Sequence, residues 1–449
     1  MTAQADESCH PSFGPDDPRS CEERLEDLRR IFQQINNVNR RQHDSTVRGE
    51  LIRLLRERRS ERSDLDQFDV VPDPRGGEVL VVPGELVIRA RALDDPLVRQ
   101  LIEAYELQPE PVECLDNRVA VLKAPGLGGG QLADLAGALR ARGVPAALNY
   151  VTPMGIVMKG LGGPEPSAGP APERPPAGPG EPIQVAVIDT GIAEQPRDDG
   201  WLDGLVRPGN IDPLNELPTP PDQFLDLGAG HGTFAAGVVQ QVAPGANIIM
   251  YRALDSDGIG SKVRLACAMV QAARYGAQVI NLSLGLEALD DRPPLALQVA
   301  LEMIDEIAAA NDREVLVVAA AGNFGRDRPC WPAAFCNVVA VGALTQDLEP
   351  ADWSSRGPWV DCSTMGEGVR STYVEGEESP KVDPKPDRFG PDAWALWSGT
   401  SFAAPQVAGA IAKIAQEQQV GPREALRRLL DGQREVPGYG RAVEILPRT

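Results

Sequence analysis

The sequence lacks the features by which a chain crosses a membrane or binds nucleic acid. No uninterrupted run of about 18 apolar residues occurs, so no membrane-spanning helix is expected. The start of the chain shows no basic segment followed by an apolar one, and therefore does not look like a secretory signal. The 44 Lys and Arg residues are outnumbered by 65 Asp and Glu, giving a net charge of −21. Such a field repels nucleic acids and anionic membranes, so neither is an expected partner.

Cysteine is scarce as well, and its positions follow no pattern. The 7 cysteines are an odd number without metal-ligand spacing, which favours reduced thiols over a disulfide framework. Cys330 and Cys336 form the only plausible pair. We therefore expect a cytoplasmic protein, with no metal site and no cofactor.

The N-terminal region, residues 1–70, is expected to be helical. Ser20 and Glu23 have capping-box spacing, and apolar residues then recur at helical period, so a helix should begin there. A second, arginine-rich helix is predicted from Leu51 to Arg59. Its charge run is typical of a solvated face rather than of a binding patch.

Residues 78–158 read as a small α+β module. Strand-like "EVLVVPGELVIRA" precedes a helix capped by Asp95 and Pro96, and then come the strand "RVAVLKA", a helix stopped by Gly143, and the extended run "VPAALNYV". This order suggests a ferredoxin-like split βαβ. The Pro/Gly-rich residues 159–182 have no apolar face to bury and are predicted to be a linker.

From residue 183 to 449 the pattern is that of an α/β domain with a parallel sheet. Strands apolar on both faces alternate with helix-period segments, which implies helices on both sides of the sheet. The predicted strands are "IQVAVID", "NIIMYRAL", "AQVINLSL", "EVLVVAAAGN" and "NVVAVGAL". In such a fold, catalytic groups collect at the carboxyl ends of the strands.

Three residues of this domain supply what acyl transfer requires. Asp189 ends a predicted strand, His231 is one of only 3 histidines and opens a helix after a Gly-rich turn, and Ser401 begins an apolar helix in "SGTSFAAPQVAG". In that order they provide an acid, a base and a nucleophile. Asn323, on the turn "AAAGNFG", offers an amide donor for an oxyanion, with the backbone N–H of Ser401 as a second donor. Ser401 as a mere helix cap is the alternative reading.

The segments "VAVIDTGI", "GHGTFAAG", "VINLSLG", "AAAGNFG" and "SGTSFAAPQVAG" resemble the successive signature segments of the subtilisin-like serine proteases. The resemblance implies a serine endopeptidase with Asp189, His231 and Ser401 as the triad and Asn323 as oxyanion donor. It also implies a substrate strand edge and a pocket for the residue before the cut, formed by Ser283, Leu284, Gly285, Ala320, Ala321 and Gly322. Cys330 falls at the bottom of that pocket, where a thiol should keep it short and apolar.

The chain departs from the secreted members of that family by a short stretch after the His231 helix, which lacks the insertion that many of them use to bind calcium. No such site is therefore expected, and Asp255 and Asp257 are interpreted as loop acids. The order Asp, His, Ser and the presence of Ala403 in "GTSFA" exclude the lipase-type elbow. "GLGGGQ" lacks the Lys-Ser/Thr ending of a phosphate loop.

Two functions follow from these features. The first is an endopeptidase acting on a peptide or protein substrate and restrained by its own N-terminal module, because many proteases of this kind carry an α+β prodomain at that position. That reading places the last strand of the module against the Ser283–Gly285 edge. The alternative is a restrained or silent scaffold that binds protein partners.

Overall fold

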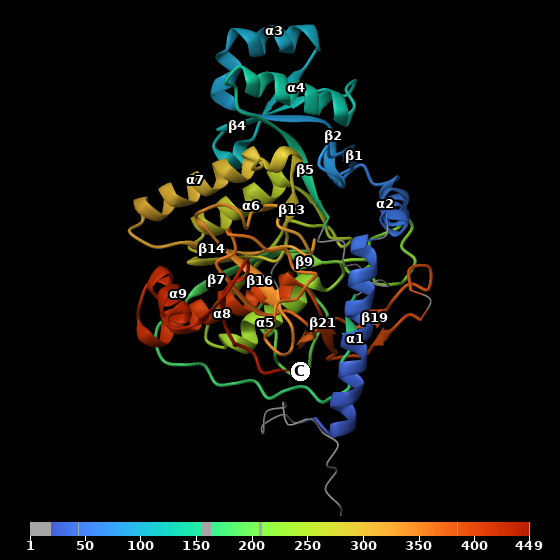
Figure 1. Ribbon diagram of the computed structural model, residues 1–449, viewed down its shortest axis with the longest axis vertical. Coiled ribbons are helices and arrows are strands. Elements are labelled where there is room, and N and C mark those ends of the chain that lie inside the picture. Colours follow the sequence, from blue (N-terminus) through green and yellow to red (C-terminus); the bar gives the residue numbers. More distant parts are fainter. Residues whose placement is uncertain (1–18, 44, 154–162, 206–208, 384, 449) are drawn as a thin grey trace, which may run out of the picture.

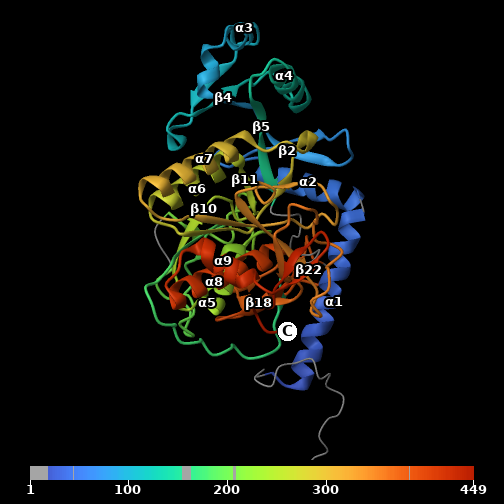
Figure 2. The ribbon, with the colours of Figure 1, turned by 60° about the vertical axis from the view of Figure 1, so that its left-hand side comes forward.

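The computed structural model describes residues 19–43, 45–153, 163–205, 209–383 and 385–448. A large α/β domain carries a smaller α+β module at one end, and a long N-terminal helix runs along its side (Figures 1 and 2). Among the described residues, no helix combines the length and the apolar character needed to cross a bilayer.

The large domain is built on an eight-stranded sheet in the order β10-β7-β12-β14-β16-β17-β23-β22. All neighbouring strands are parallel except the last pair. The strands are β7 (Gln184–Asp189), β10 (Asn247–Arg252), β12 (Val279–Leu282), β14 (Leu316–Ala320), β16 (Val338–Leu344), β17 (Cys362–Met365), β22 (Arg434–Val436) and β23 (Gly440–Ala442). The five apolar runs predicted as strands are all confirmed.

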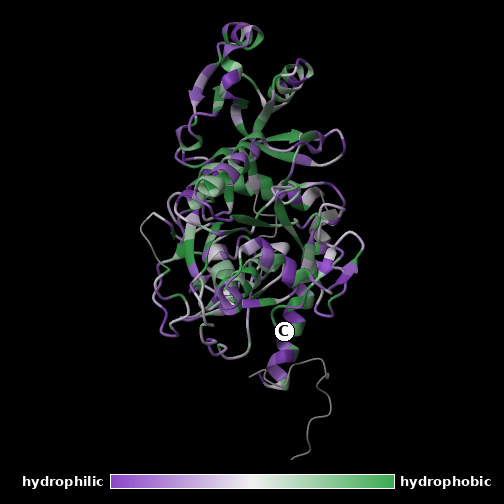
Figure 3. Ribbon diagram, turned by 90° about the vertical axis from the view of Figure 1, so that its left-hand side faces the viewer, coloured by the Kyte–Doolittle hydropathy of each residue, from purple (hydrophilic) through white to green (hydrophobic). Residues whose placement is uncertain are grey.

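Helices cover both faces of this sheet, as the apolar strands require. Val185 and Val187 of β7 belong to the core under one set of helices, whereas Ala186 and Ile188 belong to the core under the other set. The first set is α5 (His231–Val242), α8 (Thr400–Gln418) and α9 (Pro422–Leu430), and the second is α6 (Lys262–Arg274) and α7 (Leu295–Ala310). Figure 3 shows hydrophobic residues gathered in the central strands and hydrophilic residues along the outer loops.

The module has the element order β-α-β-β-α-β after a first short strand, with the antiparallel order β5-β2-β4-β3. Its elements are β1 (Asp69–Pro72), β2 (Glu78–Arg89), η1 (Ala90–Asp94), α3 (Pro96–Ala104), β3 (Gln108–Pro111), η2 (Glu113–Leu115), β4 (Val119–Lys123), α4 (Gly129–Ala141) and β5 (Ala146–Pro153). The sequence did not predict β3, whose residues are Gln-Pro-Glu-Pro. Proline is tolerated there because β3 is an exposed edge strand.

Two helices precede the module, α1 (Cys21–His43) and α2 (Ser45–Arg59). The predicted capping box is present, since the backbone N–H of Ser20 donates to Glu23 Oε2 at 2.7 Å and that of Glu23 donates to Ser20 Oγ at 3.3 Å. Helix α2 begins six residues earlier than predicted. The interpretation of its arginines as a solvated face is wrong at Arg58 and Arg59, which are buried.

The residues predicted as a linker lie against the large domain where the structure describes them. Strand β6 (Glu165–Pro166) pairs with β21 (Trp394–Trp397), which also pairs with β18 (Val369–Thr372). Asp27 of α1 accepts a hydrogen bond from the backbone N–H of Ala168 at 2.8 Å. The remaining short elements are β8 (Ile192–Ala193), β9 (Ile211–Asp212), β13 (Leu286–Glu287), η3 (Leu289–Asp291), β15 (Cys330–Trp331), β19 (Gly376–Glu377) and β20 (Arg388–Phe389).

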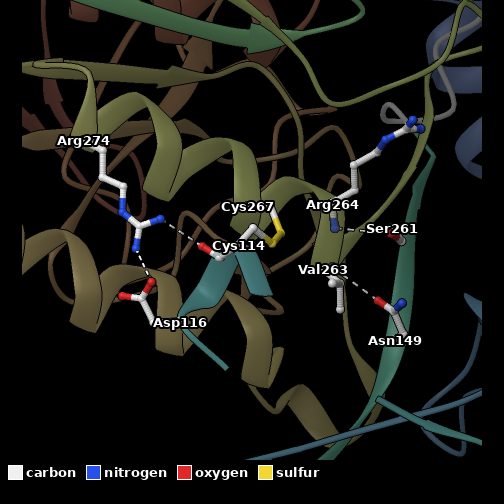
Figure 4. Close-up of a disulfide and its surroundings, with 8 residues drawn as sticks. All are labelled: Cys114, Asp116, Asn149, Ser261, Val263, Arg264, Cys267 and Arg274. Carbon is white, nitrogen blue, oxygen red and sulfur yellow. Dashed lines mark hydrogen bonds and ion pairs between the residues drawn. A yellow bond between two sulfur atoms is a disulfide. The ribbon is translucent and has the colours of Figure 1, made fainter. Parts of the chain in front are cut away.

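A disulfide joins the module to the large domain. Cys114 of η2 is bonded to Cys267 of α6, 153 residues further along the chain (Figure 4). Beside it, Arg274 of α6 donates to Asp116 Oδ1 at 2.6 Å. The expectation of reduced thiols is therefore wrong for these two cysteines. The suggested pair of Cys330 and Cys336 is wrong too, because both are free, one buried and one exposed.

Candidate active site

Asp189 and His231 form a hydrogen-bonded pair at the carboxyl end of β7. His231 is the first residue of α5, and its Nδ1 lies 2.8 Å from Asp189 Oδ1. The backbone N–H of Thr190 also donates to Asp189 Oδ1, at 2.7 Å. Helix α5 can approach this turn because residue 232 is glycine: a Cβ there would lie 2.1 Å from the carbonyl oxygen of Gly191. Both members of the pair are buried, so their interaction is shielded from solvent.

A second carboxylate, Asp212, was not found from the sequence. Its Oδ2 accepts from Thr190 Oγ1 and from the backbone N–H of Gly230, both at 2.9 Å. Asp212 thus fixes the residues that flank Asp189 and His231. Burial raises the pKa of its carboxyl to about 6. A lone Asp at the end of a two-residue strand gives no sequence signal for such a role.

Ser401 is the second residue of α8, and the residue that follows it packs against the His231 ring. Its neighbour Phe402 contacts that ring with centroids 5.1 Å apart, and Trp397 contacts it edge-on at 5.2 Å. Behind Ser401, its carbonyl oxygen accepts from Ser283 Oγ at 2.7 Å. The first residues of α8 are therefore held between the α5 helix and the end of β12.

Asn323 faces the same helix start from the turn after β14. Its Oδ1 accepts from the backbone N–H of Thr400 at 3.0 Å and from Thr400 Oγ1 at 2.9 Å. Its Nδ2 lies over Gly399, where an added Cβ would be 3.4 Å away. Because Oδ1 is held by Thr400, the amide N–H groups are oriented beside the start of α8. This orientation suits an oxyanion donor.

The predicted pocket residues follow the neighbouring strands β12 and β14 and are buried. They are Ser283, Leu284, Gly285, Ala320, Ala321 and Gly322. Cys330 Sγ lies close to both strand ends. A Cβ added at Gly285 would be 2.5 Å from this sulfur, and one added at Gly322 would be 2.8 Å from it. Burial raises the pKa of the Cys330 thiol well above its usual value, so the group is a neutral, apolar filler.

The structure adds a strand edge that sequence reasoning missed. Strand β11 (Ile259–Ser261) pairs antiparallel with the last three residues of β5, Val151 to Pro153. The module was expected to place this strand against Ser283–Gly285, and the observed partner is β11 instead. Residues 154–158 of the predicted module lie outside the described residues. The pairing shows that an extended chain can add to the edge of β11.

A parallel sheet that brings an Asp–His pair, a helix-start serine and an oriented amide to one edge has the architecture of a serine protease. The sequence profile of the subtilase family matches residues 180–432, more than half of the chain. The protein belongs to the subtilase family, and the resemblance read from its motifs is confirmed.

The chain is also similar to curated proteins. The chain is 34% identical over 260 residues to the thermophilic serine proteinase of Bacillus sp. (strain AK1), which covers 55% of this chain and 56% of that protein. It is 33% identical over 247 residues to subtilisin BL of Lederbergia lenta, covering 53% of this chain and 78% of that protein. The chain thus spans little more than half the length of the first of these relatives.

Two solved structures share the fold over most of the chain. Fervidolysin from Fervidobacterium pennivorans, a keratinolytic enzyme related to subtilisin, aligns over 81% of this chain and 60% of its own, with a TM-score of 0.55 and 21% identity. The epidermin leader peptide processing serine protease of Staphylococcus aureus aligns over 81% and 97%, with a TM-score of 0.50 and 19% identity. The large domain alone makes up less than 81% of the chain. The similarity of fold therefore extends into the N-terminal part.

Proposed function

We propose that the chain is a serine endopeptidase that hydrolyses peptide bonds in peptide or protein substrates through an acyl-enzyme. The observation that carries the proposal is the 2.8 Å contact between Asp189 Oδ1 and His231 Nδ1, together with the contact of the His231 ring with Phe402, the residue after Ser401 at the start of α8. With Nδ1 held by the carboxylate, Nε2 is the ring nitrogen that accepts the proton of Ser401. Asp189 orients the ring and stabilises its cationic form.

The oxyanion that forms when Ser401 attacks is stabilised by Asn323 and by the backbone N–H of Ser401 at the start of α8. The aromatic rings of Trp397 and Phe402 pack against the imidazole and shield it from solvent. The substrate chain lies beside Ser283 to Gly285. The substrate side chain before the cut enters the pocket between Gly285 and Gly322, both of which Cys330 contacts.

Labelling with a fluorophosphonate probe tests this function, because the probe reacts only with an activated serine. We expect one label per chain, on Ser401. The alternative function, a silent scaffold that binds protein partners, predicts a folded protein that takes up no label. Wild-type protein that keeps its fold and stays unlabelled even after the chain is cut between residues 154 and 182 would therefore overturn the proposal.

The pocket predicts a preference for a medium-sized apolar residue, such as Leu or Met, before the cut. Replacing Cys330 by glycine removes the thiol that lies against Gly285 and Gly322 and deepens the pocket. The variant Cys330→Gly should gain about 1–3 kcal/mol of transition-state binding for Phe or Tyr relative to Leu. A peptide library compares kcat/KM of the two proteins, with Cys336→Ser as the exposed control. A wild-type preference for Arg or Asp contradicts this pocket.

The N-terminal module restrains the enzyme in the same proposal. Its support is the pairing of Val151 to Pro153 with β11, which denies that edge to a substrate strand. A cut after β5 turns these three residues into a chain end, and chain ends detach from a short ladder easily.

Limited digestion of the chain between residues 154 and 182 tests the restraint. Peptide hydrolysis should rise after the cut, since a substrate can then displace the end of β5. Equal activity before and after complete cutting would show that the module does not restrain the enzyme. A cytoplasmic location stays a prediction, against which the disulfide weighs because such bonds are rare in reducing compartments.

A further inference from the structure

The last two arginines of α2 are inserted into the large domain. Arg58 and Arg59 have exposures of 7% and 0%. Arg58 Nε donates to Asp257 at 3.0 Å (Oδ2) and 3.2 Å (Oδ1), and its terminal nitrogen donates to Asp226 Oδ1 at 2.5 Å. Arg59 donates to Asp255 Oδ2. Asp255 and Asp257 are therefore the partners of a helix from the N-terminus, and their interpretation as plain loop acids is wrong.

These carboxylates hold the two loops that lead into the candidate active site. Asp255 Oδ1 accepts from the backbone N–H of Ile259, the first residue of β11, at 3.0 Å. Asp257 Oδ1 accepts from the backbone N–H of Leu227 at 3.1 Å. Arg59 is thus connected to β11, the proposed substrate edge, through the carboxylate of Asp255.

The path from Arg58 leads to the catalytic base. After Leu227, the backbone N–H of Gly228 donates to the carbonyl of Ser256 at 2.8 Å. The backbone N–H of His231 then donates to the carbonyl of Gly228 at 3.2 Å. The path consists of one bond from a backbone N–H to the Asp257 carboxylate and two backbone–backbone bonds, so a shift of Asp257 should displace the turn that carries His231.

The two loops depend on the arginines because the cluster brings three buried carboxylates together. Asp226, Asp255 and Asp257 are at most 1% exposed. Burial raises the pKa of Asp226 to about 8 and that of Asp255 to about 6, although Arg58 and Arg59 act to lower them. Removing a guanidinium leaves a buried carboxylate without its partner. This destabilises a protein far more than replacing both members of the pair by apolar residues.

We propose that Arg58 and Arg59 are positioning residues of the active site, so that α2 belongs to the working enzyme even after the chain is cut behind β5. The proposal rests on the proposed function, since it assigns a role in that hydrolysis. The disulfide between Cys114 and Cys267 acts in the same direction, because it keeps the N-terminal part bound. Contacts that served only to anchor an inhibitory module would give the opposite result on mutation, a gain of activity.

The test compares Arg58→Gln and Arg59→Gln in the full-length, oxidised protein after the same limited cut. Arg58→Gln should lower kcat roughly 10- to 100-fold, the effect of a displaced catalytic group. Arg59→Gln should act mainly on KM, raising it roughly tenfold, because it loosens the edge where substrate binds. The rate of fluorophosphonate labelling of Ser401 should fall with kcat. Arg53→Gln is the matched control, since Arg53 lies on the same helix, is 70% exposed and pairs with Glu57.

Rescue separates positioning from a general loss of stability. In the Arg59→Gln background, Asp255→Asn removes the unpaired charge and should restore at least part of the lost activity. Arg58→Lys and Arg59→Lys keep the charge and should retain more activity than the Gln variants, which keeps the test usable if those fold poorly. Higher activity in both Gln variants, unchanged activity, or a loss that follows only the melting temperature and resists rescue would overturn the inference. Inactive, unlabelled wild-type protein would instead sink the proposed function.

Discussion

Replacement of Ser401 by alanine is expected to abolish peptide hydrolysis and to leave the fold unchanged. In the subtilisin system the loss of the nucleophile lowers kcat by about 10⁶-fold, and a fall of that order is expected here. The fold should survive because the substitution removes a single oxygen atom and leaves the backbone of the helix start unchanged. The hydrogen bond from the Ser283 hydroxyl to the backbone carbonyl of residue 401 is kept in the variant.

Steady-state kinetics and circular dichroism on wild type and Ser401→Ala check this expectation. Ser60→Ala serves as the control, because Ser60 is an exposed serine whose hydroxyl donates to the carbonyl of Glu57. The variant should also block any self-cleavage and any fluorophosphonate labelling. Equal turnover by Ser401→Ala and wild type would remove Ser401 from the mechanism altogether.

Asn323 should give the second large effect, confined to kcat. Loss of one oxyanion donor lowers kcat by roughly 10² to 10³, a magnitude taken from subtilisin itself. Asn323→Ala also removes the acceptor for the two Thr400 bonds, so it mixes catalysis with structure. Asn323→Asp keeps that acceptor and replaces the donor with a carboxylate oxygen, which repels the oxyanion.

We therefore expect Asn323→Asp to lose at least as much kcat as Asn323→Ala while keeping a wild-type melting curve. Asn311→Ala is the control, because Asn311 is exposed and donates only to its own helix, at the carbonyl of Ile307. A change limited to KM in either Asn323 variant would speak against an oxyanion role.

The sequence predicts the sheet well because its signals are local. β7, β12, β14 and β16 are mostly apolar runs, and such runs can be recognised in the sequence without knowledge of their neighbours in the sheet. The capping box at Ser20 and the Asp95 cap of α3 are equally local. By contrast, β3 is a strand only because β4 offers it an edge, which no property of Gln-Pro-Glu-Pro indicates.

For the candidate site, residue types could be predicted but supporting contacts could not. Asp189, His231 and Ser401 stand out because each lies in a segment of unusual composition. The role of Asp212 depends on a turn folded elsewhere, and its neighbours give no hint of it. Arg58 was misread for a related reason: an arginine run looks the same whether it faces water or carboxylates 168 residues and more away.

The bond between Cys114 and Cys267 changes how maturation of this protein would look at the bench. A molecule cut between β5 and β7 still consists of two pieces joined through sulfur, with Cys114 in one and Cys267 in the other. On a denaturing gel without reductant it migrates as a single band, with no smaller fragment to show that the cut has occurred. Mass spectrometry under the same conditions finds the full-length mass plus one water when a single bond has been hydrolysed. On gels, a processed molecule is distinguished from an intact one by running samples with and without reductant side by side.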